Sequence, residues 1–162
     1  ADLTDIIRQV DAISLIHQHL EQNRTVAEVD FKEYIKELTE SLLKTAAPYD
    51  IDLKIKINEG MLPTKTVLTL GLIINELATN ALKYGFSADE NYIFGIEQMK
   101  APDSAFIKLK VSNNGKPFPD DVDIDTSGGL GLKLIKTLCA QLDGSVELQK
   151  KPVTSFILTC RI

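Results

Sequence analysis

The sequence predicts a two-layer α/β sandwich: a mixed β-sheet with helices on one face, preceded by an N-terminal helix. In the 162-residue chain, segments with apolar residues every three to four positions are interspersed with segments in which apolar and polar residues alternate. After the N-terminal helix the order is helix, strand, helix, strand, strand, helix, strand, strand, which is typical of an α/β sandwich. Hydrophobic content of 44% and charged content of 25% indicate a folded globular protein.

The first twenty residues carry an apolar seam with spacings of three and four, which predicts a helix in a bundle or dimer seam. The seam residues are Leu3, Ile6, Val10, Ile13, His17 and Leu20. An amphipathic helix lying on its own domain is the alternative. His17 falls on the seam and His19 off it. A lone histidine on a seam is more often a packing or capping residue than a reactive one, and a phosphoacceptor role for either histidine is the disfavoured alternative. Residue 1 lies inside the helical pattern without a cap, as expected for a piece of a longer chain.

A polar break from Glu21 to Val29 is interpreted as a linker. Asp30 then caps a second helix, with Glu33 placed to reach back to the cap, and the apolar stripe of this helix continues to about Thr45. Alternation of apolar and charged residues predicts a half-buried strand from 51 to 57.

The second half of the chain continues in the same way. Pro63 and Thr64 open a long apolar helix that continues through Tyr84. The later strands are expected at 92–98, 105–112, 145–149 and 155–161, and a last helix at 130–142. A polar loop from Asn113 to Ser127 precedes that helix.

Charge and cysteine content narrow the class of protein. A net charge of -5 argues against a general nucleic-acid binder, because such proteins carry an excess of Lys and Arg. Cys139 and Cys160 have neither metal-ligand nor disulfide-framework spacing, so we interpret them as buried thiols in a reducing compartment. No apolar run of membrane-spanning length is visible, and we expect a cytoplasmic domain.

The long helix carries Glu76, Asn80 and Lys83 at positions i, i+4 and i+7, so on a regular helix they share one face. Polar groups beside an apolar surface are costly unless a ligand or partner satisfies them. They suit a magnesium nucleotide, with Asn80 as an oxygen ligand, Lys83 as a phosphate contact and Glu76 as a base. A solvated helix face is the alternative.

Two glycine-bearing segments flank the polar loop. Asn113-Asn114-Gly115 follows a strand, and Gly128-Gly129-Leu130-Gly131-Leu132-Lys133 opens a helix, where free N–H groups favour a phosphate. Neither segment has the spacing of a P-loop or a dinucleotide fingerprint. A hairpin turn and a simple helix entry are the respective alternatives. Asp121, Asp123 and Asp125 imitate calcium ligands, but without the required glycine and glutamate they are interpreted as a solvated lid.

Taken together and in order, these segments resemble the N, G1 and G2 boxes of the Bergerat-fold (GHKL, HATPase_c) ATPases, and in particular sensor histidine kinases of the HisKA_2 and HWE-like group. The resemblance covers nearly the whole chain. It implies that residues 1–22 are the second helix of a dimerisation and phosphotransfer hairpin and that residues 23–162 are the ATP-binding catalytic domain. The family's phosphoacceptor histidine box is absent here, so the histidine that is phosphorylated is expected outside these residues.

The resemblance also implies roles for individual residues toward ATP and Mg²⁺. Asn80 ligates the metal and Glu76 orients or deprotonates the incoming imidazole. The remaining residues contact the nucleotide. At the phosphates these are Lys83 and the segment from Gly129 to Leu132, with Lys133 beside them. Tyr84 lines the pocket, Leu130 or Leu132 covers the adenine or ribose, and Asn113 with Gly115 lies at the base.

Two positions depart from the family's pattern. Asn113 stands where the family usually has Asp as an acceptor for the adenine amino group, and a neutral acceptor weakens that bond by roughly 1 kcal/mol. Pro117 stands where a second glycine is common, which stiffens the loop and removes a donor.

The function implied is phosphoryl transfer from ATP to a histidine, for relay to an aspartate of a response-regulator receiver domain, in a full-length homodimer. The alternative is a degenerate Bergerat domain of a histidine phosphotransferase or scaffold that docks a regulator without ATP. An anti-sigma serine kinase is disfavoured by the bundle-like first helix.

Overall fold

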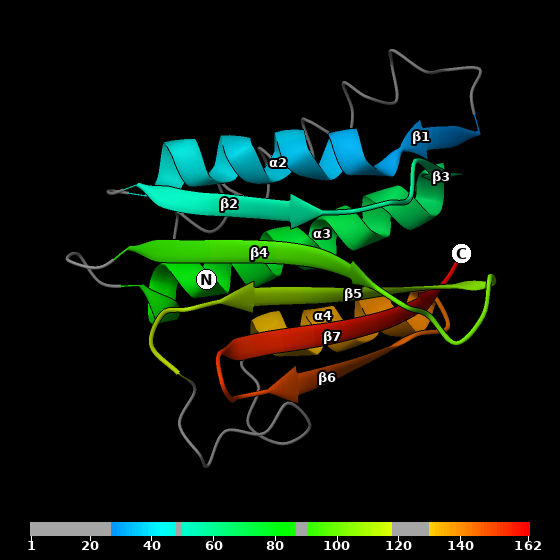
Figure 1. Cartoon of the computed structure of the whole chain (residues 1–162). Helices are drawn as coiled ribbons and strands as arrows, with labels where there is room; N and C mark the ends of the chain where they lie inside the picture. Colours follow the sequence, from blue (N-terminus) through cyan, green and yellow to red (C-terminus); the bar gives the residue numbers. More distant parts are fainter. Residues whose placement is uncertain (1–26, 48–49, 87–90, 118–129) are drawn as a thin grey trace.

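A five-stranded mixed sheet forms one layer of the molecule, with strands in the order β2-β4-β5-β7-β6 (Figure 1). The computed structural model describes residues 27–47, 50–86, 91–117 and 130–162. β2 and β4 are parallel, and the other neighbouring pairs are antiparallel. The strands are β2 (Ile51–Lys56), β4 (Tyr92–Met99), β5 (Phe106–Asn113), β6 (Ser145–Gln149) and β7 (Thr154–Arg161).

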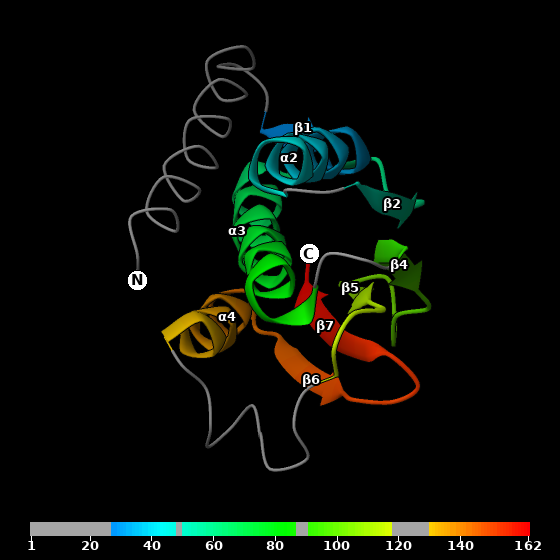
Figure 2. The ribbon, with the colours of Figure 1, turned by 90° about the vertical axis from the view of Figure 1, so that its left-hand side faces the viewer.

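Three α-helices of the described part of the chain cover one face of this sheet, and none of them lies on the other face (Figure 2). They are α2 (Phe31–Ala46), α3 (Thr64–Asn80) and α4 (Leu130–Gln141), with α3 lying between the other two. This arrangement confirms the predicted sandwich with a mixed sheet and helices on one face. The elements expected in the described ranges form within a few residues of their predicted ends.

The sheet face beneath the helices is apolar along most of its length. Because directly paired residues project from the same face, each cross-strand row can be followed across the sheet. Ile96 pairs with Val111 and Val111 with Phe156, and all three are buried. The next row on this face runs from buried Phe94 through Asn113 to Thr154, so the apolar stripe gives way to two polar side chains on β5 and β7.

The two helices α2 and α3 pack closely through Tyr34 and Gly71. A Cβ atom at Gly71 would lie 2.6 Å from Cε1 of the fully buried Tyr34 ring, so the helices approach at a position without a side chain. The start of α2 is as predicted, since the backbone N–H of Glu33 donates to Oδ1 of Asp30 over 3.1 Å.

The structure corrects the predicted linker, because part of it is a strand. β1 (Glu28–Asp30) pairs antiparallel with β3 (Met61–Pro63), and the apolar pair Val29 and Leu62 is buried. The N–H groups of Phe31 and Thr64 donate to the carbonyls of Gly60 and Ala27, which extends this pairing at both ends. Three-residue strands are too short for an alternation pattern to reveal them.

The helix predicted to continue through Tyr84 also differs from the structure. Its α-helical part ends at Asn80, and Ala81–Gly85 form a π-helical turn, η1. The N–H of Phe86 donates to the carbonyl of Ala81 over 3.0 Å, which closes the wider turn. Such turns occur frequently at functional sites.

The packing of α4 against β7 brings the two cysteines together in the core. Cys139 and Cys160 are free and buried, as predicted. A hydrogen bond from the Cys139 thiol to Cys160, together with burial, raises the pKa of Cys139. Among the helices of the described ranges, none has both the length and the hydropathy needed to cross a membrane.

Candidate functional site

The polar face of α3 meets the first turn of α4. A Cβ atom added at Gly131 would lie 2.7 Å from Oε1 of Glu76 and 3.5 Å from both polar atoms of the Asn80 amide. The first turn of α4 therefore packs directly against the carboxylate end of Glu76 and the amide of Asn80. N–H groups in the first turn of a helix have no partner within the helix, so this contact places two α3 polar groups beside open donors.

The third member of the predicted face lies beyond the α-helical part of the segment. Lys83 is exposed and sits in the π-helical turn η1. A π-helix has more residues per turn than an α-helix, so the i+7 alignment expected for a regular helix does not apply to Lys83. The backbone of Tyr84 belongs to the same turn, while its side chain lies outside the described part of the structure.

The loop that follows β5 packs against the C-terminal end of η1. The backbone N–H of Lys116 donates to the carbonyl of Gly85 over 2.5 Å. A Cβ atom at Gly115 would clash with the Gly85 carbonyl oxygen and would lie 2.8 Å from Cδ1 of Phe86. Gly115 is therefore needed for close backbone packing between the loop and the end of η1.

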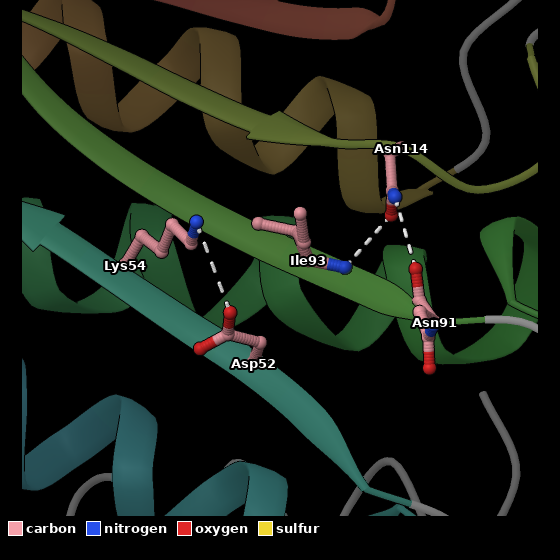
Figure 3. A network of polar contacts seen from close by, with 5 residues as sticks. All are labelled: Asp52, Lys54, Asn91, Ile93 and Asn114. Atoms are coloured by element: carbon pink, nitrogen blue, oxygen red, sulfur yellow. Dashed lines mark hydrogen bonds and ion pairs between the residues drawn. The ribbon is translucent and has the colours of Figure 1, made fainter.

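Asn114 connects the loop after β5 to the start of β4 by hydrogen bonds (Figure 3). Its Oδ1 accepts from the N–H of Ile93 over 2.7 Å, and its Nδ2 donates to the carbonyl of Asn91 over 3.1 Å. Sequence reasoning treated Asn114 only as part of a motif, and its structural role was missed. The Asp52–Lys54 pair in the same view is 3.9 Å apart with both side chains exposed, so it adds little stability.

Asn113, the last residue of β5, and Thr154, the first residue of β7, form a polar cross-strand pair. Oδ1 of Asn113 accepts from the N–H of Gly115 over 3.1 Å, which fixes the orientation of the amide. Thr154 is 2% exposed, and its hydroxyl has no hydrogen-bond partner among the described residues. Thr154 was missed because the strand was expected to begin at Ser155, although it continues the alternation of Phe156 and Leu158.

The remaining predicted residues are placed as follows. Leu132 is 7% exposed and packs in the core, and Lys133 is exposed on the next position of α4. Gly129, the side chain of Leu130, the acidic residues of the predicted lid, and His17 and His19 lie outside the described residues. The contact roles of Leu132 and Lys133 stay predictions.

The residues present fit a nucleotide and one magnesium ion. A buried hydroxyl without a partner normally marks a missing hydrogen-bonding group, and Thr154 has one at the end of the apolar stripe. Asn80 and Glu76 lie directly beside Gly131 in the first turn of α4. Within the described ranges no cluster of three or more His, Cys, Asp or Glu residues could hold a metal alone. Mg²⁺ commonly takes only one or two protein oxygens and completes its shell with phosphates and water.

A hollow of about 490 Å³ lies elsewhere, between α2 and β2. Its lining includes Leu43, Ile51 and Leu53, with Glu40, Lys44 and Asp50 also contributing. This lining has mixed charge and none of the predicted site residues, so the hollow is separate from the site on α3 and α4.

Two family models match the chain. A model described as histidine kinase matches residues 1–46, and one described as histidine kinase-, DNA gyrase B- and HSP90-like ATPase matches residues 65–162. The first match extends past residue 22 and includes α2, which in the structure packs against α3 as part of the sandwich. The domain boundary at residues 22 and 23 stays a prediction.

The curated relatives of similar sequence include histidine kinases. The chain is 28% identical over 156 residues to the sensor histidine kinase PdtaS of Mycolicibacterium smegmatis, covering 93% of this chain and 30% of that protein. A blue-light-activated histidine kinase 2 of Erythrobacter litoralis is 21% identical over 149 residues, covering 88% of this chain and 42% of that protein. The chain therefore spans less than half of either relative.

Solved structures show the same fold. The histidine kinase domain of a blue-light-activated kinase from Erythrobacter litoralis superposes with a TM-score of 0.80 at 18% identity, covering 95% of this chain and 72% of that chain. The ATP-binding domain of PrrB from Mycobacterium tuberculosis has a TM-score of 0.62 at 17% identity, covering 83% of this chain and 94% of that chain.

Proposed function

Because the chain belongs to the histidine kinase-, DNA gyrase B- and HSP90-like ATPase family, we propose that it binds magnesium ATP between α3, the loop after β5 and the start of α4. In the full-length protein this domain phosphorylates a histidine on a helical hairpin of the same or a sister chain. The observation that carries the proposal is the convergence of Glu76 and Asn80 on the backbone of Gly131.

Each side chain has a role that follows from its chemistry. Asn80 offers a neutral amide oxygen, a hard ligand that suits Mg²⁺. The backbone around Gly131 and the positive end of α4 favour phosphate oxygens, and exposed Lys83 and Lys133 add positive charge near them. ATP when bound supplies the phosphoryl group, and Mg²⁺ offsets the negative charge of its phosphates.

Glu76 is the proposed base. Its carboxylate can accept the N–H of an incoming imidazole, which keeps the attacking nitrogen unprotonated and aimed at the phosphate. Most of the rate enhancement then comes from positioning and charge neutralisation, because phosphoryl transfer leaves little covalent chemistry for the protein.

We propose further that the phosphorylated histidine passes its phosphoryl group to an aspartate of a response-regulator receiver domain. The full-length protein is proposed to act as a homodimer in the cytoplasm. The alternative scaffold without ATP is not favoured, since Glu76, Asn80 and Gly131 are brought together at α4.

Titration calorimetry with ATP in the presence and absence of Mg²⁺ tests the proposal. We expect saturable binding by the wild-type chain and loss of its Mg²⁺ dependence in Asn80→Ala, while Asn58→Ala, an exposed position near β2, binds normally. No binding at millimolar nucleotide would refute the ATP-dependent function. Equal binding by Asn80→Ala would remove Asn80 from the metal role.

A further inference from the structure

The orientation of Asn113 decides which chemical groups the base end of the site presents. Its Oδ1 faces the loop, because it accepts from the N–H of Gly115 and lies 3.1 Å from the position of a Cβ atom at Gly85. The reversed amide would set Nδ2 against the N–H of Gly115, placing two donors together. The group that Asn113 can offer to a ligand is therefore its NH₂, a donor.

Thr154 supplies the second group. It pairs directly with Asn113 across β5 and β7, so both side chains project from the helix-covered face. Its hydroxyl is buried and has no partner among the described residues. A hydroxyl can donate one hydrogen bond and accept others, so Thr154 can accept from an N–H group of a ligand.

A carboxylate at position 113 would be acceptor-only and would select a 6-aminopurine, because the carbonyl of a 6-oxopurine is also an acceptor. The Asn113 NH₂ has no such bias. It can donate to N1 of adenine while Thr154 accepts from the 6-amino group, or donate to the 6-oxo group while Thr154 accepts from the N1 proton.

We propose that Asn113 and Thr154 make this site tolerant of 6-oxopurine nucleoside triphosphates, so that it binds inosine-type nucleotides about as well as ATP. This inference rests on the proposed function, since it concerns the same nucleotide site. Asn113 is then the residue that sets base specificity, and Thr154 is the acceptor that serves both binding modes.

ITP is the probe that tests this, because it differs from ATP only at the 6-position and the adjacent N1 proton. In calorimetric titrations with Mg²⁺ we expect the wild-type Kd for ITP to lie within about fivefold of that for ATP, a small difference on the affinity scale. Asn113→Asp should tighten ATP and weaken ITP, which moves the ratio by about tenfold or more toward ATP.

Thr154→Val and Thr154→Ser separate recognition from structure. Removal of the hydroxyl in Thr154→Val should weaken both nucleotides, while Thr154→Ser should retain binding of both. A wild-type preference for ATP above about thirtyfold, or an unchanged ratio in Asn113→Asp, would overturn the specificity inference and leave the proposed function standing. Failure of both nucleotides to bind would overturn both.

Discussion

Replacing Gly115 with alanine tests the packing that positions the loop after β5. The new Cβ atom would lie 2.6 Å from the carbonyl carbon of Gly85 and 2.8 Å from Cδ1 of Phe86. Restoring an ordinary separation of roughly 3.5 Å between carbon atoms requires a shift of about 1 Å. The Gly85 carbonyl belongs to the backbone and cannot turn aside as a flexible side chain can, so we expect the loop itself to move.

The shift puts two hydrogen bonds at risk: Lys116 to the Gly85 carbonyl, and Gly115 to Asn113. At about 0.5–1.5 kcal/mol each, their loss costs about 1–3 kcal/mol of unfolding free energy. Because Asn113 loses the bond that orients its amide, we also expect ATP binding to weaken by about tenfold, which equals about 1.4 kcal/mol.

Urea unfolding followed by circular dichroism gives the first quantity, and a magnesium ATP titration of the same preparation gives the second. Gly60→Ala is the matched control, since no atom lies within 4 Å of its added Cβ. A Gly115→Ala protein within about 0.5 kcal/mol of wild type, the range of ordinary surface substitutions, would refute the close packing of this loop on Gly85.

Three further predictions follow from other parts of the structure. Asn114→Ala should lower the unfolding free energy by about 1–2 kcal/mol through loss of both bonds to the β4 end, and Asn114→Asp, which keeps the acceptor, should lose about half of that in the same urea assay. Cys139 and Cys160 should resist an aromatic disulfide reagent at pH 8 in the native protein and react fully in denaturant, because both thiols are buried. The hydrogen bond that raises the pKa of Cys139 also disfavours the Cys139 thiolate. Rapid reaction of the native protein would contradict this prediction. Burial raises the pKa of Tyr34 above its ordinary 10.0. The stability that the neutral phenol contributes is therefore complete below pH 10 and is lost as the pH rises above 10. The unfolding free energy of Tyr34→Phe should fall less steeply with alkaline pH than that of the wild type.

The layered fold was predictable because its signals are long and local. Helical periodicity over sixteen or seventeen residues marks α2 and α3, and alternation marks β2, where every second residue is exposed. The pairing of β1 with β3 was not predictable, since each strand has three residues and their bonds join positions more than thirty apart. The π-helical turn η1 was missed because it depends on the tertiary position of the chain that follows Asn80, which no local pattern of residues encodes.

The candidate site also has a part that was predictable from local sequence and a part that depends on tertiary structure. Glu76 and Asn80 lie one helical turn apart on α3, so their shared face was visible in the sequence. Their contact with Gly131 is tertiary and was expected only through the resemblance to the ATPase boxes. The partnership of Asn113 with Thr154 depends on the register of β5 and β7, and a strand start misplaced by one residue was enough to hide Thr154.

The central claim is that a nucleotide binds where α3, the loop after β5 and α4 converge. The most direct measurement is the change in backbone amide NMR shifts on addition of Mg²⁺ and a non-hydrolysable ATP analogue. We predict the largest changes at Asn80, Gly115, Gly131 and Thr154, with little change at Leu43 in the hollow between α2 and β2. Saturable shifts centred on that hollow, or no shifts at millimolar analogue, would contradict the claim.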